Sequence, residues 1–149
     1  MNVKQLGLAA LLASIGAASS AQTAISVAKD ANCGCCSAWA TIMEQEGYSI
    51  AIENTTYEAL DALKAARGVP AEMAGCHTAT VEGYTIEGHV PAADIARLLA
   101  ERPDAVGLSV PGMPMGSPGM GPETNRDAYD VMLIKADGQT EVFASYPAR

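Results

Sequence analysis

The sequence predicts a single α/β domain, and three observations support this prediction. Segments with the periodicity of an amphipathic helix alternate along the chain with short segments whose apolar and polar residues alternate as in a strand. Glycine or proline stands where each expected helix should end. The first 21 residues resemble a removable leader, and residues 22–149 have the length of one compact domain.

The leader has the composition of a secretory signal peptide. Lys4 is its only charged residue, residues 6–18 form an apolar run rich in alanine and leucine, and residues 19–21 offer the small side chains of a cleavage site. The apolar run is shorter than the roughly 20 residues that a membrane span requires. We therefore expect an exported chain that leaves the membrane after cleavage, and the alternative is an uncleaved N-terminal anchor.

The first half of the chain should hold two helices that alternate with strands. Apolar residues with helical spacing, such as Trp39 and Met43, mark the first helix, and Gly47 ends it. Gly68 ends the second helix in the same way. The expected elements are a strand at residues 24–29, a helix at 36–46, a strand at 48–52 and a helix at 57–67.

The second half should hold two hairpins and a third helix. Glu82-Gly83 and Asp137-Gly138 are turn sequences between strand-like segments, and Pro91 is suited to the first position of a helix. The expected elements are strands at residues 77–81 and 84–89, a helix at 91–101, a Gly/Pro/Met loop at 106–122, and strands at 129–135 and 141–146.

The order through residue 101, β-α-β-α-β-β-α, is the minimal thioredoxin-like layout, and the loop and last hairpin add a C-terminal extension. A right-handed crossover makes the first two strands parallel. The loop after the first strand then meets the N-terminus of the first helix, and Cys33, Cys35 and Cys36 lie there. Cys76 precedes the third strand, which passes beside the same helix end, so the layout predicts that four sulfurs converge.

These four cysteines are the strongest candidates for function. The unpaired N–H groups and the dipole at a helix N-terminus favour the thiolate, which binds metals and also attacks disulfides. Soft thiolates select Cu(I), zinc or iron–sulfur clusters, but zinc and iron–sulfur sites use more widely spaced ligands. Three cysteines within four positions therefore favour a polynuclear Cu(I)–thiolate cluster, held by Cys33, Cys35, Cys36 and Cys76.

Two alternatives remain open for the cysteines. An even number of cysteines in an exported chain is typical of structural disulfides, and Cys33–Cys36 with Cys35–Cys76 is one such pairing. The C-x-x-C pair of Cys33 and Cys36 is also typical of a working dithiol. In that case the protein would be an enzyme, either a thiol–disulfide oxidoreductase or a copper oxidoreductase.

Histidines and methionines are weaker candidates. Strand alternation should turn His77 away from the side that Cys76 faces, which favours a solvated or hydrogen-bonded histidine over a metal ligand. His89 is interpreted as a polar residue at the end of a strand, and the alternative is a metal ligand. Met113 and Met115 in the loop carry soft thioethers that suit copper, and the alternative is an apolar cover for the site.

The charge of the chain excludes one class of partner. The formal net charge is −8 at pH 7, and the few basic residues are scattered, so the chain has no electrostatic surface for nucleic acid. The carboxylates show no paired spacing for acid–base catalysis, and no phosphate-binding loop is present in the sequence.

Three segments carry a family resemblance: CGCCSAWA from residue 33, GVPAEMAGCHTATVEGYTIEGHVPAADIARLLAERP from residue 68, and VGLSVPGMPMGSPGM from residue 106. Together they resemble the CopG-like family of exported copper-resistance proteins, long filed as a domain of unknown function. The resemblance covers about residues 24–146. It implies a thioredoxin-like fold, a periplasmic location, copper held by the cysteine motif, and a role in the redox state of copper. Copper ions and other periplasmic copper-handling proteins are the partners that we expect.

The chain departs from the family pattern at two points. Gly75 stands where the family usually has serine, which we expect to loosen the turn beside Cys76. Asp30-Ala31-Asn32 replaces the usual lead-in to the cysteine motif, and this change predicts that Asn32 caps the first helix. Neither departure removes a sulfur.

Overall fold

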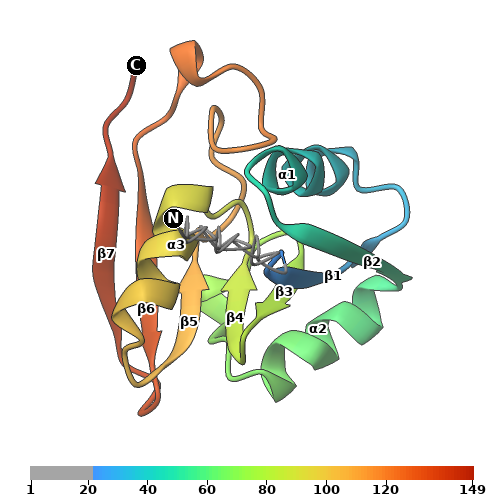
Figure 1. Cartoon of the computed structure of the whole chain (residues 1–149), viewed down its shortest axis with the longest axis vertical. Coiled ribbons are helices and arrows are strands. Elements are labelled where there is room, and N and C mark those ends of the chain that lie inside the picture. Colours follow the sequence, from blue (N-terminus) through green and yellow to red (C-terminus); the bar gives the residue numbers. More distant parts are fainter. Residues whose placement is uncertain (1–21) are drawn as a thin grey trace, which may run out of the picture.

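The computed structural model describes residues 22–149, so the predicted leader lies outside the described range. Over the described residues the chain forms one seven-stranded sheet with three α-helices (Figure 1), and none of these helices is long and apolar enough to cross a membrane. The elements are β1 (Ala24–Asp30), α1 (Gly34–Gln45), β2 (Ser49–Thr55), α2 (Tyr57–Ala66), η1 (Ala71–Met73), β3 (Thr78–Val81), β4 (Tyr84–Glu87), α3 (Ala92–Glu101), β5 (Ala105–Ser109), η2 (Glu123–Asn125), β6 (Tyr129–Lys135) and β7 (Thr140–Tyr146).

The element order through α3 is confirmed. β1 pairs in parallel with β2, as the predicted crossover through α1 requires, and it pairs antiparallel with β3 on its other side. The hairpin of β3 and β4 turns at Glu82 and Gly83, whose φ angles are 46° and 92°. Two successive positive φ angles are typical of the tight turn that matches the twist of paired strands.

The prediction of an unbroken loop at residues 106–122 is wrong, because Ala105–Ser109 forms the strand β5. β5 is parallel to β4 and antiparallel to β6, so the hairpin of β6 and β7 continues the main sheet in the order β2-β1-β3-β4-β5-β6-β7. The hairpin is therefore part of the sheet and not an appended extension. Gly107 and the glycines and prolines that follow interrupt the alternation of apolar residues by which a strand is recognised in a sequence. The segment is nevertheless part of the core, and Leu108 is fully buried.

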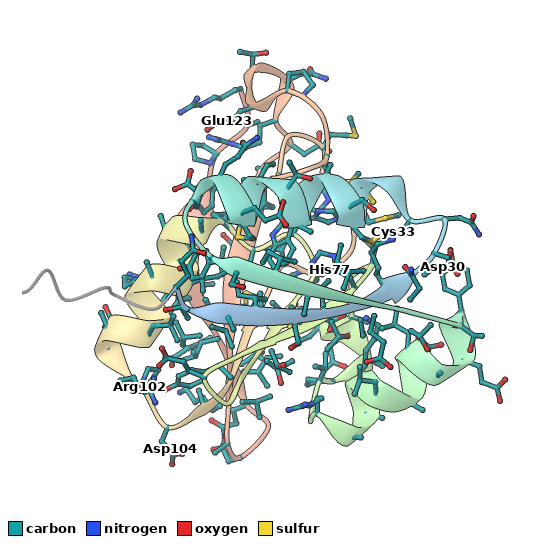
Figure 2. The ribbon with its side chains drawn as sticks, turned by 45° about the vertical axis from the view of Figure 1, so that its right-hand side comes forward. Asp30, Cys33, His77, Arg102, Asp104 and Glu123 are labelled. Carbon is teal, nitrogen blue, oxygen red and sulfur yellow. A yellow bond between two sulfur atoms is a disulfide. The ribbon has the colours of Figure 1, made fainter. Side chains whose placement is uncertain are left out.

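The three helices cover the sheet from two sides. Trp39 and Met43 of α1 and Ile95 and Leu98 of α3 belong to one buried core cluster with residues of the central strands. α2 packs against β1 and β3 from the opposite face. This arrangement brings the N-terminus of α1 beside the chain segment that leads into β3, and Figure 2 shows Cys33 at that end of the helix with His77 between the helix and the sheet.

Candidate metal centre

The cysteine loop joins α1 at Cys33, which is the N-cap residue of the helix. Its Sγ accepts a hydrogen bond from the Cys36 backbone N–H at 3.3 Å. The prediction that Asn32 caps the helix is wrong, because the side-chain acceptor is one residue later and the Asn32 N–H donates to Asp30 Oδ1 at 2.9 Å. The helix is therefore capped by the sulfur of Cys33, and its first turn contains Cys35 and Cys36.

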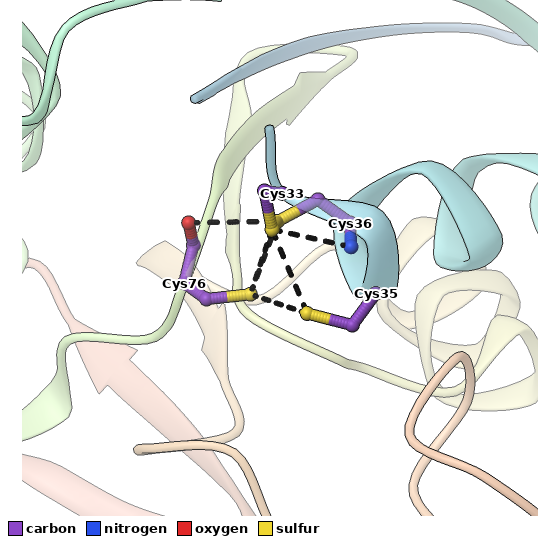
Figure 3. Close-up of side chains that lie close together, drawn as sticks. All are labelled: Cys33, Cys35, Cys36 and Cys76. Atoms are coloured by element: carbon purple, nitrogen blue, oxygen red, sulfur yellow. Dashed lines mark hydrogen bonds between the residues drawn. A yellow bond between two sulfur atoms is a disulfide. The ribbon is translucent and has the colours of Figure 1, made fainter. Parts of the chain in front are cut away.

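Four cysteine sulfurs meet at this helix end, as the layout predicts (Figure 3). Three come from the start of α1, and the fourth comes from Cys76 in the segment before β3. The Cys76 Sγ lies 3.1 Å from the Sγ of Cys36, 3.6 Å from that of Cys35 and 3.7 Å from that of Cys33. All four sulfurs lie within 4.8 Å of one another, which is close enough for bridging thiolates to share metal ions.

The site is in a half-oxidised state. Cys33 and Cys36 form a disulfide, whereas Cys35 and Cys76 are free thiols. The second disulfide of the alternative pairing, Cys35–Cys76, is not formed, and these two sulfurs remain at a non-bonded distance of 3.6 Å. In this state the site offers two thiols, and reduction of the disulfide would offer four thiols in the same place.

His89 lies directly at the cluster, which its interpretation as a strand-end polar residue missed. Its side chain is fully buried, and its Nε2 lies 3.0 Å from Cys76 Sγ. The hairpin register explains this position, because Thr78 pairs with Glu87 and two further steps along both strands bring Cys76 opposite His89. The signal was therefore present in the sequence, in the Glu82-Gly83 turn that sets the register.

The Pro118 carbonyl fixes the orientation of the His89 ring. His89 Nδ1 lies 2.8 Å from the Pro118 O, and a carbonyl can only accept, so Nδ1 carries the proton. The neutral ring then presents the Nε2 lone pair to Cys76 Sγ. A histidine whose second nitrogen donates to a backbone carbonyl is the usual arrangement of a metal ligand.

His77 is buried rather than solvated, contrary to the sequence interpretation. Its ring packs against Trp39 with centroids 4.5 Å apart, and its Nδ1 lies 3.8 Å from Cys76 Sγ. Its Nε2 is buried without a hydrogen-bond partner among the described residues. Cys76, His77 and His89 together form a second group of potential metal ligands that shares one sulfur with the cysteine cluster.

Burial raises the pKa of the Cys76 thiol to about 12, and the hydrogen bond with Cys35 and the charge of Cys35 add to this effect. The thiol is therefore protonated at neutral pH in the metal-free protein. A metal ion that binds Cys76 must displace this proton, so its affinity should rise with pH.

Both histidines are neutral at physiological pH. Burial, and then the charge of His89, lowers the pKa of His77 well below 6.5; burial also lowers the pKa of His89, against the opposing effect of the Pro118 hydrogen bond. Neutral imidazoles have a free lone pair, which is the form that ligates metals.

The lowered histidine pKa values predict that acid destabilises the metal-free protein. The unfolded chain takes up protons near pH 6.5, whereas the folded chain does so only at lower pH, so this stability is complete above pH 6.5 and is lost as pH falls. We expect the free energy of unfolding in urea to decrease between about pH 7.5 and about pH 5.5. Since the chain has two histidines, a His77→Gln/His89→Gln variant should lose this dependence, and an equal slope in that variant would contradict the explanation.

The Gly/Pro/Met loop contacts the site through Pro118 and Gly119. A Cβ on Gly119 would lie 2.7 Å from the Cys35 carbonyl oxygen, so only glycine allows the loop to lie this close to the first turn of α1. Met113 and Met115 are 56% and 42% exposed. Their role as outer copper ligands stays a prediction.

The turn before Cys76 is closely packed, and the looseness expected from Gly75 is not found. A Cβ on Gly75 would lie only 2.6 Å from the Gly88 Cα, and Gly75 forms a β-bridge with Gly112. The Gly88 N–H also donates to the His77 carbonyl at 2.9 Å. These backbone contacts hold Cys76 between two neighbouring segments.

Comparisons with known proteins agree on one relationship. The family described as "Protein of unknown function, DUF411" matches residues 73–120, and no curated protein matches the chain. Two solved structures match nearly the whole described chain. "Copper resistance protein copG- Form 1" is 45% identical with a TM-score of 0.79, and the match covers 86% of this chain and 100% of that chain. "Copper resistance protein copG- Form 2" is 46% identical with a TM-score of 0.78, and the match covers 85% and 100%.

Proposed function

Because this chain belongs to the family of the CopG copper-resistance proteins, we propose that it binds Cu(I) in copper resistance or homeostasis. The observation that carries the proposal is the convergence of four cysteine sulfurs within 4.8 Å of one another. In the reduced protein, Cys33, Cys35, Cys36 and Cys76 would hold several Cu(I) ions as a polynuclear thiolate cluster. The ions are the cargo of the protein.

The donor set fits Cu(I) better than the other soft metals. Thiolates and neutral imidazoles are ligands that Cu(I) accepts, and sulfurs this close together favour bridged ions over a single tetrahedral zinc. The Nε2 of His89 and the Nδ1 of His77, which lie 3.0 Å and 3.8 Å from Cys76 Sγ, extend the donor set beyond the cysteines. We leave Met113 and Met115 outside the inner set because both side chains are exposed.

The proposed setting follows from the leader sequence. A signal peptide over residues 1–21 would export the chain, and the mature domain of residues 22–149 would then act in the periplasm. Its partners there would be copper ions and other copper-handling proteins, and neither nucleic acid nor a membrane is among the proposed partners. The oxidising periplasm also suits a site whose Cys33–Cys36 pair can close as a disulfide.

Copper content should depend on Cys35. We expect the protein isolated without oxygen from copper-fed cells to contain several copper atoms per chain by elemental analysis, and Cys35→Ser to contain fewer. The reason is that Cys35 Sγ lies 3.5 Å from Cys33 Sγ and 3.6 Å from Cys76 Sγ, where it can bridge ions. Ala38→Ser, at an exposed position of the same helix, is the matched control and should keep the wild-type content. Equal copper in Cys35→Ser and wild type would remove the main support for a cluster.

A second candidate function is oxidoreductase activity, which the Cys33–Cys36 disulfide favours. In a copper reaction, two thiolates would give one electron each to two Cu(II) ions, which yields two Cu(I) ions and the disulfide. In a thiol–disulfide reaction, the reduced pair would pass both electrons to a substrate disulfide. Insulin reduction by the reduced, metal-free protein tests the second version, and under the copper-binding proposal we expect no activity above that of free dithiol.

A further inference from the structure

A buried ion pair contacts the chain segment that carries Cys76. Lys64 of α2 and Glu87 of β4 are 7% and 0% exposed, and the Lys64 Nζ lies 2.5 Å from Glu87 Oε1. Lys64 Nζ also donates to Thr78 Oγ1 at 3.1 Å. The pair connects the helix on one face of the sheet to the strand hairpin that ends at the metal centre.

The Glu87 carboxylate holds the chain on both sides of Cys76. Its Oε1 accepts a hydrogen bond from the Gly75 backbone N–H at 2.7 Å, one residue before the cysteine. Its Oε2 accepts from Thr78 Oγ1 at 2.7 Å, two residues after the cysteine. Hydrogen bonds to a charged acceptor are among the stronger ones in proteins, so this carboxylate restrains the short segment that places the Cys76 sulfur.

The backbone of Glu87, as distinct from its carboxylate, leads into the other ligand segment. Glu87 is two residues before His89, and its carbonyl accepts a hydrogen bond from the Val110 N–H at 3.0 Å. The strand that carries Glu87 therefore fixes His89 directly and Cys76 through the side chain. The two groups that approach to 3.0 Å, Cys76 Sγ and His89 Nε2, are positioned by one residue.

Stability alone is a weak explanation for this pair. A buried ion pair often contributes no more stability than well-packed apolar residues of the same volume, because both charges lose their hydration. In some proteins a buried ion pair is retained because it favours one conformation over the alternatives. Here the selected geometry is that of the Cys76 turn.

We propose that Lys64 and Glu87 are positioning residues for the copper site. Glu87 holds Gly75 and Thr78, Lys64 orients and neutralises Glu87, and the two together set the place of the Cys76 sulfur without touching copper. The inference rests on the proposed function, and it adds two residues that are remote from the cysteine motif in the sequence.

The test separates positioning from stability. In Lys64→Met/Glu87→Leu, apolar side chains replace both charges, so we expect the thermal midpoint to lie well above that of either single variant. We expect its Cu(I) affinity, measured in competition with a chromophoric Cu(I) chelator, to fall about 10- to 100-fold. Lys135→Met/Glu141→Leu removes an exposed ion pair of the β6–β7 hairpin and should leave the affinity unchanged. Wild-type affinity in the Lys64/Glu87 double variant would overturn the proposal.

A second measurement does not depend on copper. In the metal-free protein with the Cys33–Cys36 disulfide, alkylation of Cys76 is followed by peptide mass spectrometry. We expect it to be faster in the double variant than in wild type, because the hydrogen bonds of Glu87 to Gly75 and Thr78 no longer restrain the segment. An unchanged rate would overturn the positioning role, even if wild type bound no copper and the proposed function failed. If the double variant does not fold, Thr78→Val removes one of the two restraints and should shift both readouts in the same direction.

Discussion

Cys76→Ser should cost the protein more copper affinity than any other single cysteine replacement. Cys76 Sγ contacts the other three sulfurs at 3.1–3.7 Å, and it lies 3.0 Å from His89 Nε2. It is also the only cysteine that joins the helix end to the β3–β4 hairpin. Loss of a residue that hydrogen-bonds to a metal ligand lowers metal affinity roughly 10- to 100-fold. Loss of Cys76, a ligand shared by the cluster, should therefore lower the Cu(I) affinity more than about 100-fold.

This expectation is measured by Cu(I) competition titration of the reduced protein in the absence of oxygen. Ala38→Ser is a matched control, because Ala38 lies at an exposed position of the same helix. Wild-type affinity in Cys76→Ser would contradict a shared ligand and would move the site to the three sulfurs of α1. A loss in both variants would indicate damage to the helix end and not to the ligand set.

Trp39→Ala should have the largest effect on stability. Trp39 is fully buried, its Nε1 donates to the Val90 carbonyl at 2.9 Å, and its ring packs on His77 at 4.5 Å between centroids. Truncation removes this packing, leaves a cavity between α1 and the sheet, and leaves a buried carbonyl without its donor. We expect a loss of about 3–5 kcal/mol in the free energy of unfolding.

Urea unfolding followed by far-ultraviolet circular dichroism measures this loss, since Trp39 is the single tryptophan and its fluorescence disappears with it. Trp39→Phe keeps much of the volume and should lose about 1–3 kcal/mol, mainly for the carbonyl left without a partner. A loss below about 1 kcal/mol in Trp39→Ala would contradict the packing described here, because it is smaller than the usual cost of such truncations.

Local sequence signals predicted most of the elements. The Glu82-Gly83 turn and the glycines after α1 and α2 predicted where strands and helices end, because Gly47, Gly68 and Gly83 adopt positive φ at small cost. They failed at β5, where Gly107 interrupts the apolar pattern and the adjacent strands β4 and β6 supply the pairing. A strand of this kind is stabilised by its neighbours more than by its own residues.

Part of the candidate site was likewise predicted from the sequence and part was missed. The cysteine spacing and the element order predicted that four sulfurs meet at the N-terminus of α1, and the structure brings them together there. The positions of the two histidines were missed. The Glu82-Gly83 turn sets the hairpin register that brings Cys76 opposite His89, so this signal was present but not used. Strand alternation gave no indication that His77 would be buried against Trp39.

By itself, the sequence determined the α/β order, the placement of three cysteines at the start of the first helix and the chemistry of the donors, because each depends on residues close together in the chain. The tertiary structure alone decided that His77 is buried against Trp39, that Lys64 and Glu87 hold the Cys76 turn, and that β5 joins the last hairpin to the sheet. Each of these contacts joins distant segments. Their geometry is set by strand register and by the burial of polar groups that must find partners, and neither is visible in local periodicity.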